Sequence, residues 1–216
     1  MTEIKRQRRA MIEGQPVLIV VDIQKGSFFK NAPQPIPLME GYSARMEQAR
    51  VVVDAAREAD IPIIFIAEVH RRTLVDFGRE LDGVEDIHCL EDDEGTPVAE
   101  EELGLRPDDY VIAKRRYSAF FGTDLEILLK GLKAQTLVLV GGLTDVCVHY
   151  TFVDSHQNDY FCRVVEDCVG GSSRPAHDAS LNAMEYLQSG ARRQSAEIVE
   201  GFRAFAAARD KLALAS

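Results

Sequence analysis

Three residues with reactive side chains lie at or just after the ends of apolar stretches of the sequence. Asp22 ends the stretch PVLIVVD, Lys114 ends DYVIAK, and Cys147 follows the glycine pair that ends TLVLVGG. Such stretches are typical of strands covered on both faces of a parallel sheet. Ligands of open parallel sheets bind outside the carboxyl ends of the strands, so the three side chains are expected at one site. A thiol, a carboxylate base and a neighbouring ammonium are the groups that a cysteine nucleophile needs.

The turn that precedes Cys147 strengthens this interpretation. Residues 141–150, GGLTDVCVHY, leave a strand through two glycines and enter a predicted helix. Thr144 or Asp145 is predicted to cap this helix, which places Cys147 in its first turn. The helix dipole and the free backbone N–H groups there stabilise a thiolate, and the same N–H groups can bind an oxyanion. Nucleophile and oxyanion donors are therefore expected from one turn.

These residues are also compatible with other roles. Taken alone, Asp22 and Lys114 fit a structural ion pair equally well, because a buried charge needs a partner. The pair Gly141-Gly142 lacks the spacing G-x-G-x-x-G and follows a late strand, which argues against dinucleotide binding. On a helix, His149 points about 200° away from Cys147, so a surface position is predicted for it.

The elements that position these residues alternate between strand and helix along the chain. This alternation predicts an α/β fold, a three-layer α/β/α sandwich around a mainly parallel, Rossmann-like sheet of six strands. The exception is the segment from Glu68 to Asp108, predicted to be a wall of the active site or a solvated excursion. Predicted strands span 16–22, 61–67, 109–114, 136–141, 162–167 and 196–199; predicted helices span 42–60, 125–132, 144–158, 175–188 and 201–214.

Length and composition set limits on the function. With 216 residues, one domain covering 1–216 is expected, with residues 1–14 as a flexible N-terminal arm. The net charge of −10 disfavours nucleic acid as a partner. No apolar run approaches the roughly 20 residues of a membrane span, and the basic N-terminus lacks the apolar core of a signal peptide, so a cytoplasmic protein without a membrane partner is expected.

None of the cysteines forms a C-x-x-C pair; Cys89, Cys162 and Cys168 are predicted to be buried thiols.

Three segments together resemble the isochorismatase-like cysteine hydrolases over nearly the whole chain. Residues 17–29 (VLIVVDIQKGSFF) are similar to the first strand of that family, with its aspartate and D-x-Q. Residues 114–121 (KRRYSAFF), with Thr123, are similar to its strand-end lysine segment, and residues 141–151 (GGLTDVCVHYT) to its nucleophile turn. The three segments also occur in the order found in the family.

The resemblance implies a catalytic triad of Asp22, Lys114 and Cys147. It implies a cis peptide between Gly142 and Leu143, with the amides of Leu143 and Cys147 as the oxyanion hole. The implied reaction is hydrolysis of a small amide or ureido C–N bond through a thioester, with release of ammonia or an amine. A homo-oligomer, dimer or tetramer, is implied as well.

The substrate-binding residues are predicted from the same segments. They are Gln24, Phe28, His70, Arg71, Tyr117 and Phe120, with His70 and Arg71 binding carbonyl or carboxylate groups. Segments around Glu68 and His70 are closer to the biuret and carbamoyl-amide branch of the family.

No metal and no cofactor are expected. Nicotinamidases of the family hold a metal with Asp-x-His…His, whereas this chain has Glu68 in place of the aspartate, then His70, and an acidic stretch before His88. The alternatives kept open are a metal-containing amidase of the nicotinamidase type and an isochorismatase. Outside this chemistry, the alternatives are a catalytically silent interaction subunit and a redox-sensing thiol protein.

Overall fold

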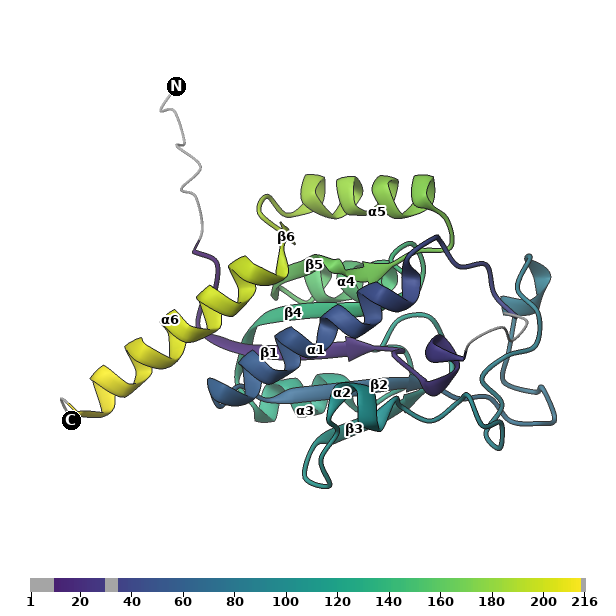
Figure 1. Cartoon of the computed structure of the whole chain (residues 1–216), viewed down its shortest axis with the longest axis horizontal. Coiled ribbons are helices and arrows are strands. Elements are labelled where there is room, and N and C mark those ends of the chain that lie inside the picture. The colour runs from purple at the N-terminus through teal and green to yellow at the C-terminus, as the bar shows by residue number, and fades with distance from the viewer. Residues whose placement is uncertain (1–9, 30–34, 215–216) are drawn as a thin grey trace.

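The computed structural model describes residues 10–29 and 35–214. Its centre is a sheet of six parallel strands in the order β3-β2-β1-β4-β5-β6 (Figure 1). The strands are β1 (Gln15–Val21), β2 (Ile63–Glu68), β3 (Tyr110–Lys114), β4 (Ala134–Gly142), β5 (Phe161–Gly170) and β6 (Arg192–Arg193). The helices are α1 (Tyr42–Glu58), α2 (Glu100–Leu103), α3 (Leu125–Gly131), α4 (Cys147–Gln157), α5 (Arg174–Leu187) and α6 (Ser195–Leu214), with short 3₁₀ helices η1 (Lys25–Phe28) and η2 (Glu80–Asp82).

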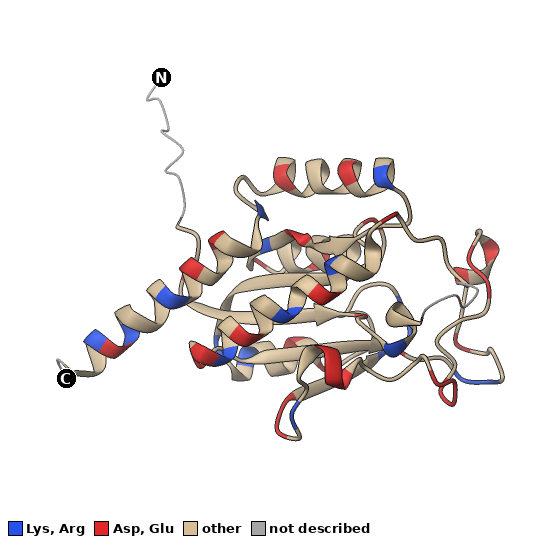
Figure 2. Ribbon diagram, in the orientation of Figure 1, with Lys and Arg blue, Asp and Glu red and all other residues tan. Residues whose placement is uncertain are grey.

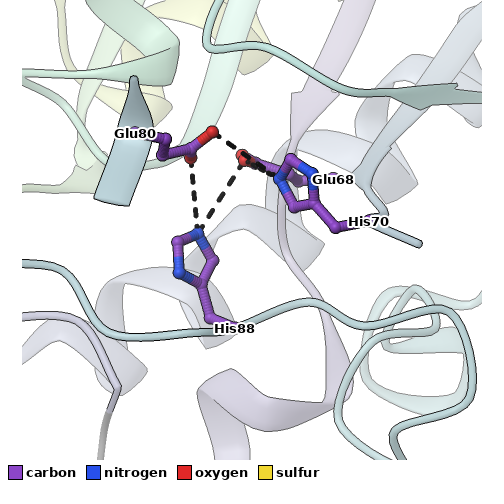
Figure 3. Close-up of side chains that lie close together, drawn as sticks. All are labelled: Glu68, His70, Glu80 and His88. Atoms are coloured by element: carbon purple, nitrogen blue, oxygen red, sulfur yellow. Dashed lines mark hydrogen bonds and ion pairs between the residues drawn. The ribbon is translucent and has the colours of Figure 1, made fainter. Parts of the chain in front are cut away.

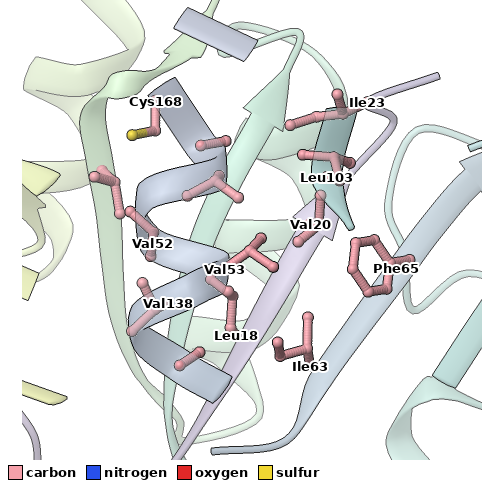
Figure 4. Packing of buried hydrophobic residues seen from close by; sticks show 14 of the residues in the cluster. Leu18, Val20, Ile23, Val52, Val53, Ile63, Phe65, Leu103, Val138 and Cys168 are labelled. Atoms are coloured by element: carbon pink, nitrogen blue, oxygen red, sulfur yellow. The ribbon is translucent and has the colours of Figure 1, made fainter. Parts of the chain in front are cut away.

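Helices cover both faces of the sheet. On one face, Leu18 and Val20 of β1 pack with α1 and α6 in a core that Figure 4 shows from close by. On the other face, Val17 and Ile19 of the same strand pack with α3, α4 and α5. Because successive strand residues point to opposite faces, a continuous apolar stretch is what a strand between two cores requires. The predicted three-layer α/β/α sandwich is thus confirmed.

The sixth strand was predicted at the wrong place. It is the two-residue β6, and the predicted strand 196–199 lies in the first turns of α6. Ile198 and Phe202, four residues apart, are both buried against the core, so helical spacing decides the conformation of this segment. Although α6 is 20 residues long, none of the described helices is both long enough and apolar enough to cross a membrane.

The N-terminal arm is anchored over the part that the structure describes. Residues 1–9 of the predicted flexible arm lie outside the described residues. The backbone oxygens of Ala10 and Met11 accept hydrogen bonds from the guanidinium of Arg163, which is 1% exposed. Glu13 exchanges two hydrogen bonds with the hydroxyl of Thr136. Residues 10–14 are therefore held against the sheet, because a buried guanidinium requires acceptors that they supply.

The strand order creates a crevice at the carboxyl ends of the two central strands of the sheet. Chain connections diverge from β1 and β4, which lie side by side in the middle, and ligands of doubly wound folds bind at such a switch point. Asp22 follows β1, and the turn toward Cys147 follows β4. The part of the excursion 69–109 that precedes α2 lies at this end of the molecule (Figure 1).

The packing predicts where a truncation damages the fold. Phe65, in β2, is fully buried, and its change to alanine is expected to lower the free energy of unfolding by about 3–5 kcal/mol, because a cavity remains in a close-packed core. Tyr186→Ala, at a side chain that is 88% exposed, is the control and is expected to stay within about 0.5 kcal/mol of the unchanged protein. Urea denaturation measures both values; equal losses in the two variants would contradict the assignment of the core.

Candidate active site

Lys114, at the end of β3, is fully buried and lies at the centre of the site. Its Nζ lies 2.9 Å from Asp22 Oδ2, 2.5 Å from Glu68 Oε2 and 3.4 Å from Cys147 Sγ. A buried ammonium needs partners that replace its water, and two carboxylates do so here. The structure brings the three predicted triad residues together and adds Glu68.

Glu68 is a further residue of the candidate site, which the sequence analysis did not place among the catalytic groups. It ends β2 and pairs with Lys114 in the register of the parallel strands β2 and β3. It also accepts a hydrogen bond of 3.5 Å from the thiol of Cys147. A carboxylate oxygen of Asp22, one of Glu68 and the Cys147 sulfur all lie within 4.8 Å of one another. The available signal was its place at a strand end; the pairing with Lys114 depends on a register that the sequence does not show.

Backbone geometry brings the turn after β4 against the end of β1. Asp22 has a φ of 50°, in the left-handed region that aspartate adopts more readily than most residues. Gly141 has a φ of 118°, and a Cβ there would lie 1.9 Å from the backbone oxygen of Val21. Only glycine therefore allows this close approach of the two strand ends.

The nucleophile turn differs from the prediction in how it is held. Cys147 is the first residue of α4, and the helix has no side-chain cap. Thr144 instead makes a 2.8 Å hydrogen bond with Nδ1 of His177, and Asp145 accepts hydrogen bonds from Ser172. The predicted cap was wrong, because the side chains of Thr144 and Asp145 bond to residues at or just before the start of α5 and not to the backbone N–H groups of α4.

The backbone of this turn offers two free donors. The peptide bond between Gly142 and Leu143 is cis. Within the described part of the chain, neither the amide of Leu143 nor that of Cys147 donates a hydrogen bond to another residue. Leu143 and Cys147 both line the cavity described below, so both amides are available to a ligand oxygen.

Burial controls the protonation of the reactive groups. It raises the pKa of Asp22 to about 6, against the opposing charge of Lys114. It also raises the pKa of the Cys147 thiol well above the usual value, although Lys114 again opposes the shift. In the resting protein, burial therefore favours the protonated thiol, which is opposite in direction to the thiolate expected from the start of the helix.

A cavity of about 370 Å³ opens beside Cys147. Of the predicted substrate-binding residues, Gln24 and Tyr117 line it. The side chain of Gln24 donates to the backbone oxygens of Glu68 and Thr96, so it also ties β2 to the excursion. Other lining residues come from the excursion and from the loop after β1, among them Phe29, Ile36, Leu38, Glu85, Ile87, Cys89 and Glu94.

The other four predicted substrate-binding residues do not line this cavity. Phe28 and Phe120 pack against the two cores on either side of the sheet. His70 is fully buried and stacks on Phe77 at 3.9 Å. Arg71 is exposed and pairs with Asp76 at 2.8 Å. Sequence patterns locate these residues near the strand ends but do not show which way each side chain points.

A second cluster adjoins the first through Glu68 (Figure 3). Glu68, His70, Glu80 and His88 are all buried, and one ligand atom of each lies within 4.8 Å of the others. His70 Nε2 lies 3.0 Å from Glu68 Oε1 and 3.6 Å from Glu80 Oε2; His88 Nε2 lies 3.4 Å from Glu80 Oε1 and 3.8 Å from Glu68 Oε1. Ligands bound at about 2.0 Å in a tetrahedron lie about 3.3 Å apart, so these residues fit a zinc-like ion.

No metal was expected, because Glu68 replaces the aspartate of the nicotinamidases and an acidic stretch separates His70 from His88. The excursion nevertheless folds back so that the centroids of the two imidazole rings lie 6.0 Å apart, and Glu80 of η2 adds a fourth candidate ligand. Without an ion, the same residues form ion pairs: burial opposes the charge of His88, but hydrogen bonds to Glu68 and Glu80 raise its pKa to about 10.

Comparisons with known proteins agree with this architecture. Residues 16–198 match the model of the isochorismatase domain. A maleamate amidohydrolase from Pseudomonas putida is 30% identical over 173 residues, covering 77% of this chain and 78% of that protein. A ureidoacrylate amidohydrolase from Stutzerimonas stutzeri is 28% identical, covering 74% and 71%. The crystal structure of an N-carbamoylsarcosine amidase from Thermoplasma acidophilum superposes with a TM-score of 0.70 at 25% identity, covering 84% of this chain and 96% of that one. The chain belongs to the isochorismatase domain family.

Proposed function

We propose that this protein is a cysteine amidohydrolase that cleaves a small amide or ureido C–N bond and releases ammonia or an amine. The observation that carries the proposal is the convergence of Cys147, Asp22 and Lys114 at a cavity lined by two residues with free backbone amides. The names of the curated relatives describe amidohydrolases, which supports the same reaction class.

The proposed mechanism begins with proton transfer. Asp22 takes the proton of the Cys147 thiol, and the sulfur attacks the carbonyl carbon of the substrate. The amides of Leu143 and Cys147 hold the oxyanion of the tetrahedral intermediate. Asp22 returns the proton to the leaving nitrogen, and the C–N bond breaks to give a thioester. Water then attacks the thioester with Asp22 again as base, which frees the acid and restores the thiol.

Asp22 suits the role of base better than Glu68 does. With a pKa of about 6, Asp22 is ionised at neutral pH yet basic enough to accept a proton. Burial acts against the charge of Glu68, but Lys114 and the hydrogen bonds of His70 and His88 hold the pKa of Glu68 well below its usual range. In this proposal Glu68 stays ionised, balances Lys114 and orients it toward Asp22 and Cys147.

We also propose that the protein acts in the cytoplasm as a homo-oligomer. The four cysteines are free thiols, as a reducing compartment would keep them. Large apolar side chains such as Phe121 and Tyr150, 65% and 54% exposed, are of the kind that subunit contacts cover.

Removal of the nucleophile tests the proposal directly. Cys147→Ala is expected to reduce ammonia release from an amide substrate at least about 1,000-fold, because the other groups act through the thiol. The matched control is Cys162→Ala, a buried cysteine of β5 outside the site, which is expected to keep most of the activity. Thermal melts of both variants show whether they fold; a folded Cys147→Ala protein with full activity would refute the mechanism.

The pH dependence tests the role of Asp22. The base works only when ionised, so kcat/KM is expected to be level above pH 6 and to fall about tenfold per pH unit below it, as Asp22 takes up its proton. Rates are measured over a range in which circular dichroism shows an unchanged fold. A rate that stays level down to pH 4 would exclude a base with the raised pKa of Asp22.

A second candidate function is a metal-containing amidase of the nicotinamidase type. The observation that favours it is a set of four buried side chains that each place one ligand atom within 4.8 Å of the others, with N···O separations of 3.0–3.8 Å. Glu68, His70, Glu80 and His88 would hold the ion, which would polarise a substrate carbonyl or a water molecule. Glu68 would then serve both the ion and Lys114 through different oxygens.

Metal removal separates the two candidates. After dialysis against a strong chelator, with metal loss verified by elemental analysis, hydrolysis is expected to continue, because the thiol, Asp22 and the two turn amides complete the acyl transfer by themselves. Glu80→Gln provides a parallel measurement of metal content and rate. A large loss of activity that one divalent ion restores would instead favour the metal-containing amidase.

A further inference from the structure

The charges on the wall of the cavity are unbalanced. Its described lining carries six carboxyl groups, from Asp22, Glu68, Glu80, Glu85, Asp93 and Glu94. Among the described lining residues there is no lysine or arginine, and His88 alone is basic. Figure 2 shows acidic positions along the excursion at this end of the molecule.

Two of these carboxylates lack a cationic partner. Partners are found for Asp22 and Glu68 (Lys114), Glu80 (His88) and Asp93 (Arg72). Within residues 10–29 and 35–214, Glu85 and Glu94 form no ion pair. Glu85 is half-buried on the wall, whereas Glu94 is exposed at the mouth. Burial raises the pKa of Glu85, and the charge of His88 only partly opposes this shift.

Two oxygens of these carboxylates are buried without a hydrogen bond. Oδ1 of Asp22 accepts none from a described residue, and Oε2 of Glu80 has only the imidazole of His70 nearby, at the ion-pair distance of 3.6 Å. Glu80 is 5% exposed, and both residues line the cavity. Buried acceptors are normally satisfied, so a ligand that brings N–H groups completes this site.

Among the lining residues that the structure describes, no lysine or arginine is available to bind the carboxylate of a ligand. Such ligands are bound in proteins by arginine or lysine, best by a bidentate guanidinium. Arg71, the candidate from the sequence, points outward to Asp76. Lys114 lies behind the carboxylates of Asp22 and Glu68 and is already shared between them.

We propose, on the basis of the amidohydrolase function above, that the cavity selects amides or ureides whose far end carries an ammonium or amidinium group. Glu85 is the specificity-determining residue, and Glu94 attracts the same charge at the mouth. An ion in the histidine cluster would neutralise Glu68 and Glu80 but would leave Glu85 and Glu94 unpaired, since these two lie outside the cluster.

Matched amides test the proposal. Hydrolysis of γ-aminobutyramide, pentanamide and glutaramate is measured as kcat/KM, together with that of the longer and shorter homologues of each. The three amides share the unit –(CH2)3–CONH2 and end in an ammonium, a methyl and a carboxylate group, respectively. We expect the best ω-amino amide to exceed its neutral isostere at least about tenfold and the ω-carboxy amide to fall below it. A higher salt concentration is expected to reduce the differences in kcat/KM between the three kinds of amide, because partly exposed charges are screened.

Variants assign the preference to the wall. Glu85→Gln is expected to reduce the ratio of kcat/KM for amino over neutral amides about tenfold. Asp82→Asn, an exposed carboxylate on the same excursion that does not line the cavity, is the control and should leave the ratio as it is. Two results would overturn the proposal: a higher kcat/KM for the ω-carboxy amide than for the ω-amino amide, or a ratio of amino over neutral amides that Glu85→Gln leaves unchanged.

Binding separates this proposal from the hydrolase function itself. Calorimetric titration of the Cys147→Ala variant with the same amides reports the charge preference without turnover. If the unchanged protein hydrolyses none of the amides while the variant binds the amino amides best, the proposed function fails and the specificity stands. If hydrolysis occurs without a charge preference in rate or binding, the specificity fails and the function stands.

Discussion

The ammonium of Lys114, removed from water beneath the end of the sheet, is the interaction on which the rest of the site depends. An unpaired charge there would cost several kcal/mol, so the fold must supply polar partners within direct contact. It does so from three different strand ends: Asp22 after β1, Glu68 on β2 and the Cys147 sulfur after β4. The parallel sheet makes this possible because the carboxyl ends of all its strands lie on the same side of the sheet. The pairings that stabilise the lysine are the same ones that hold a proton acceptor beside a thiol.

This arrangement sets the protonation states as well as the positions. Burial disfavours every charge in the cluster, and the lysine offsets that cost unequally. Glu68, nearer to the ammonium and hydrogen-bonded to histidines, stays acidic, whereas the pKa of Asp22 rises to about 6. Two carboxylates that share one cation thus have pKa values shifted in opposite directions. Burial also raises the pKa of the Cys147 thiol beside them, which favours its protonated form at rest.

Much of the fold and the centre of the site could be predicted from the sequence. Continuous apolar stretches mark buried parallel strands, and the polar residue after each one marks the functional edge, which identifies Asp22, Lys114 and Cys147. What could not be predicted depends on three-dimensional register and on the course of the excursion. Glu68 enters the site by pairing with Lys114, and Glu80 joins His70 and His88 only because a long irregular segment folds back. The predicted cap of α4 was wrong for a similar reason, since Thr144 has its partner, His177, in the next helix, α5, 33 residues further along the chain.

The side chain of Gln24 has a consequence for how such a protein can change. It links the backbone of β2 to the backbone of Thr96, and thereby fastens the excursion to the frame that carries the reactive groups. Much of the cavity wall comes from this one continuous segment, whereas the triad comes from separate strand ends. Insertions, deletions or substitutions between Glu68 and Thr96, the two residues that Gln24 links, can therefore reshape the wall while the reaction centre stays intact. An ancestor with one chemistry could in this way give rise to descendants that differ in substrate, with evolution acting mainly on a single stretch of the gene.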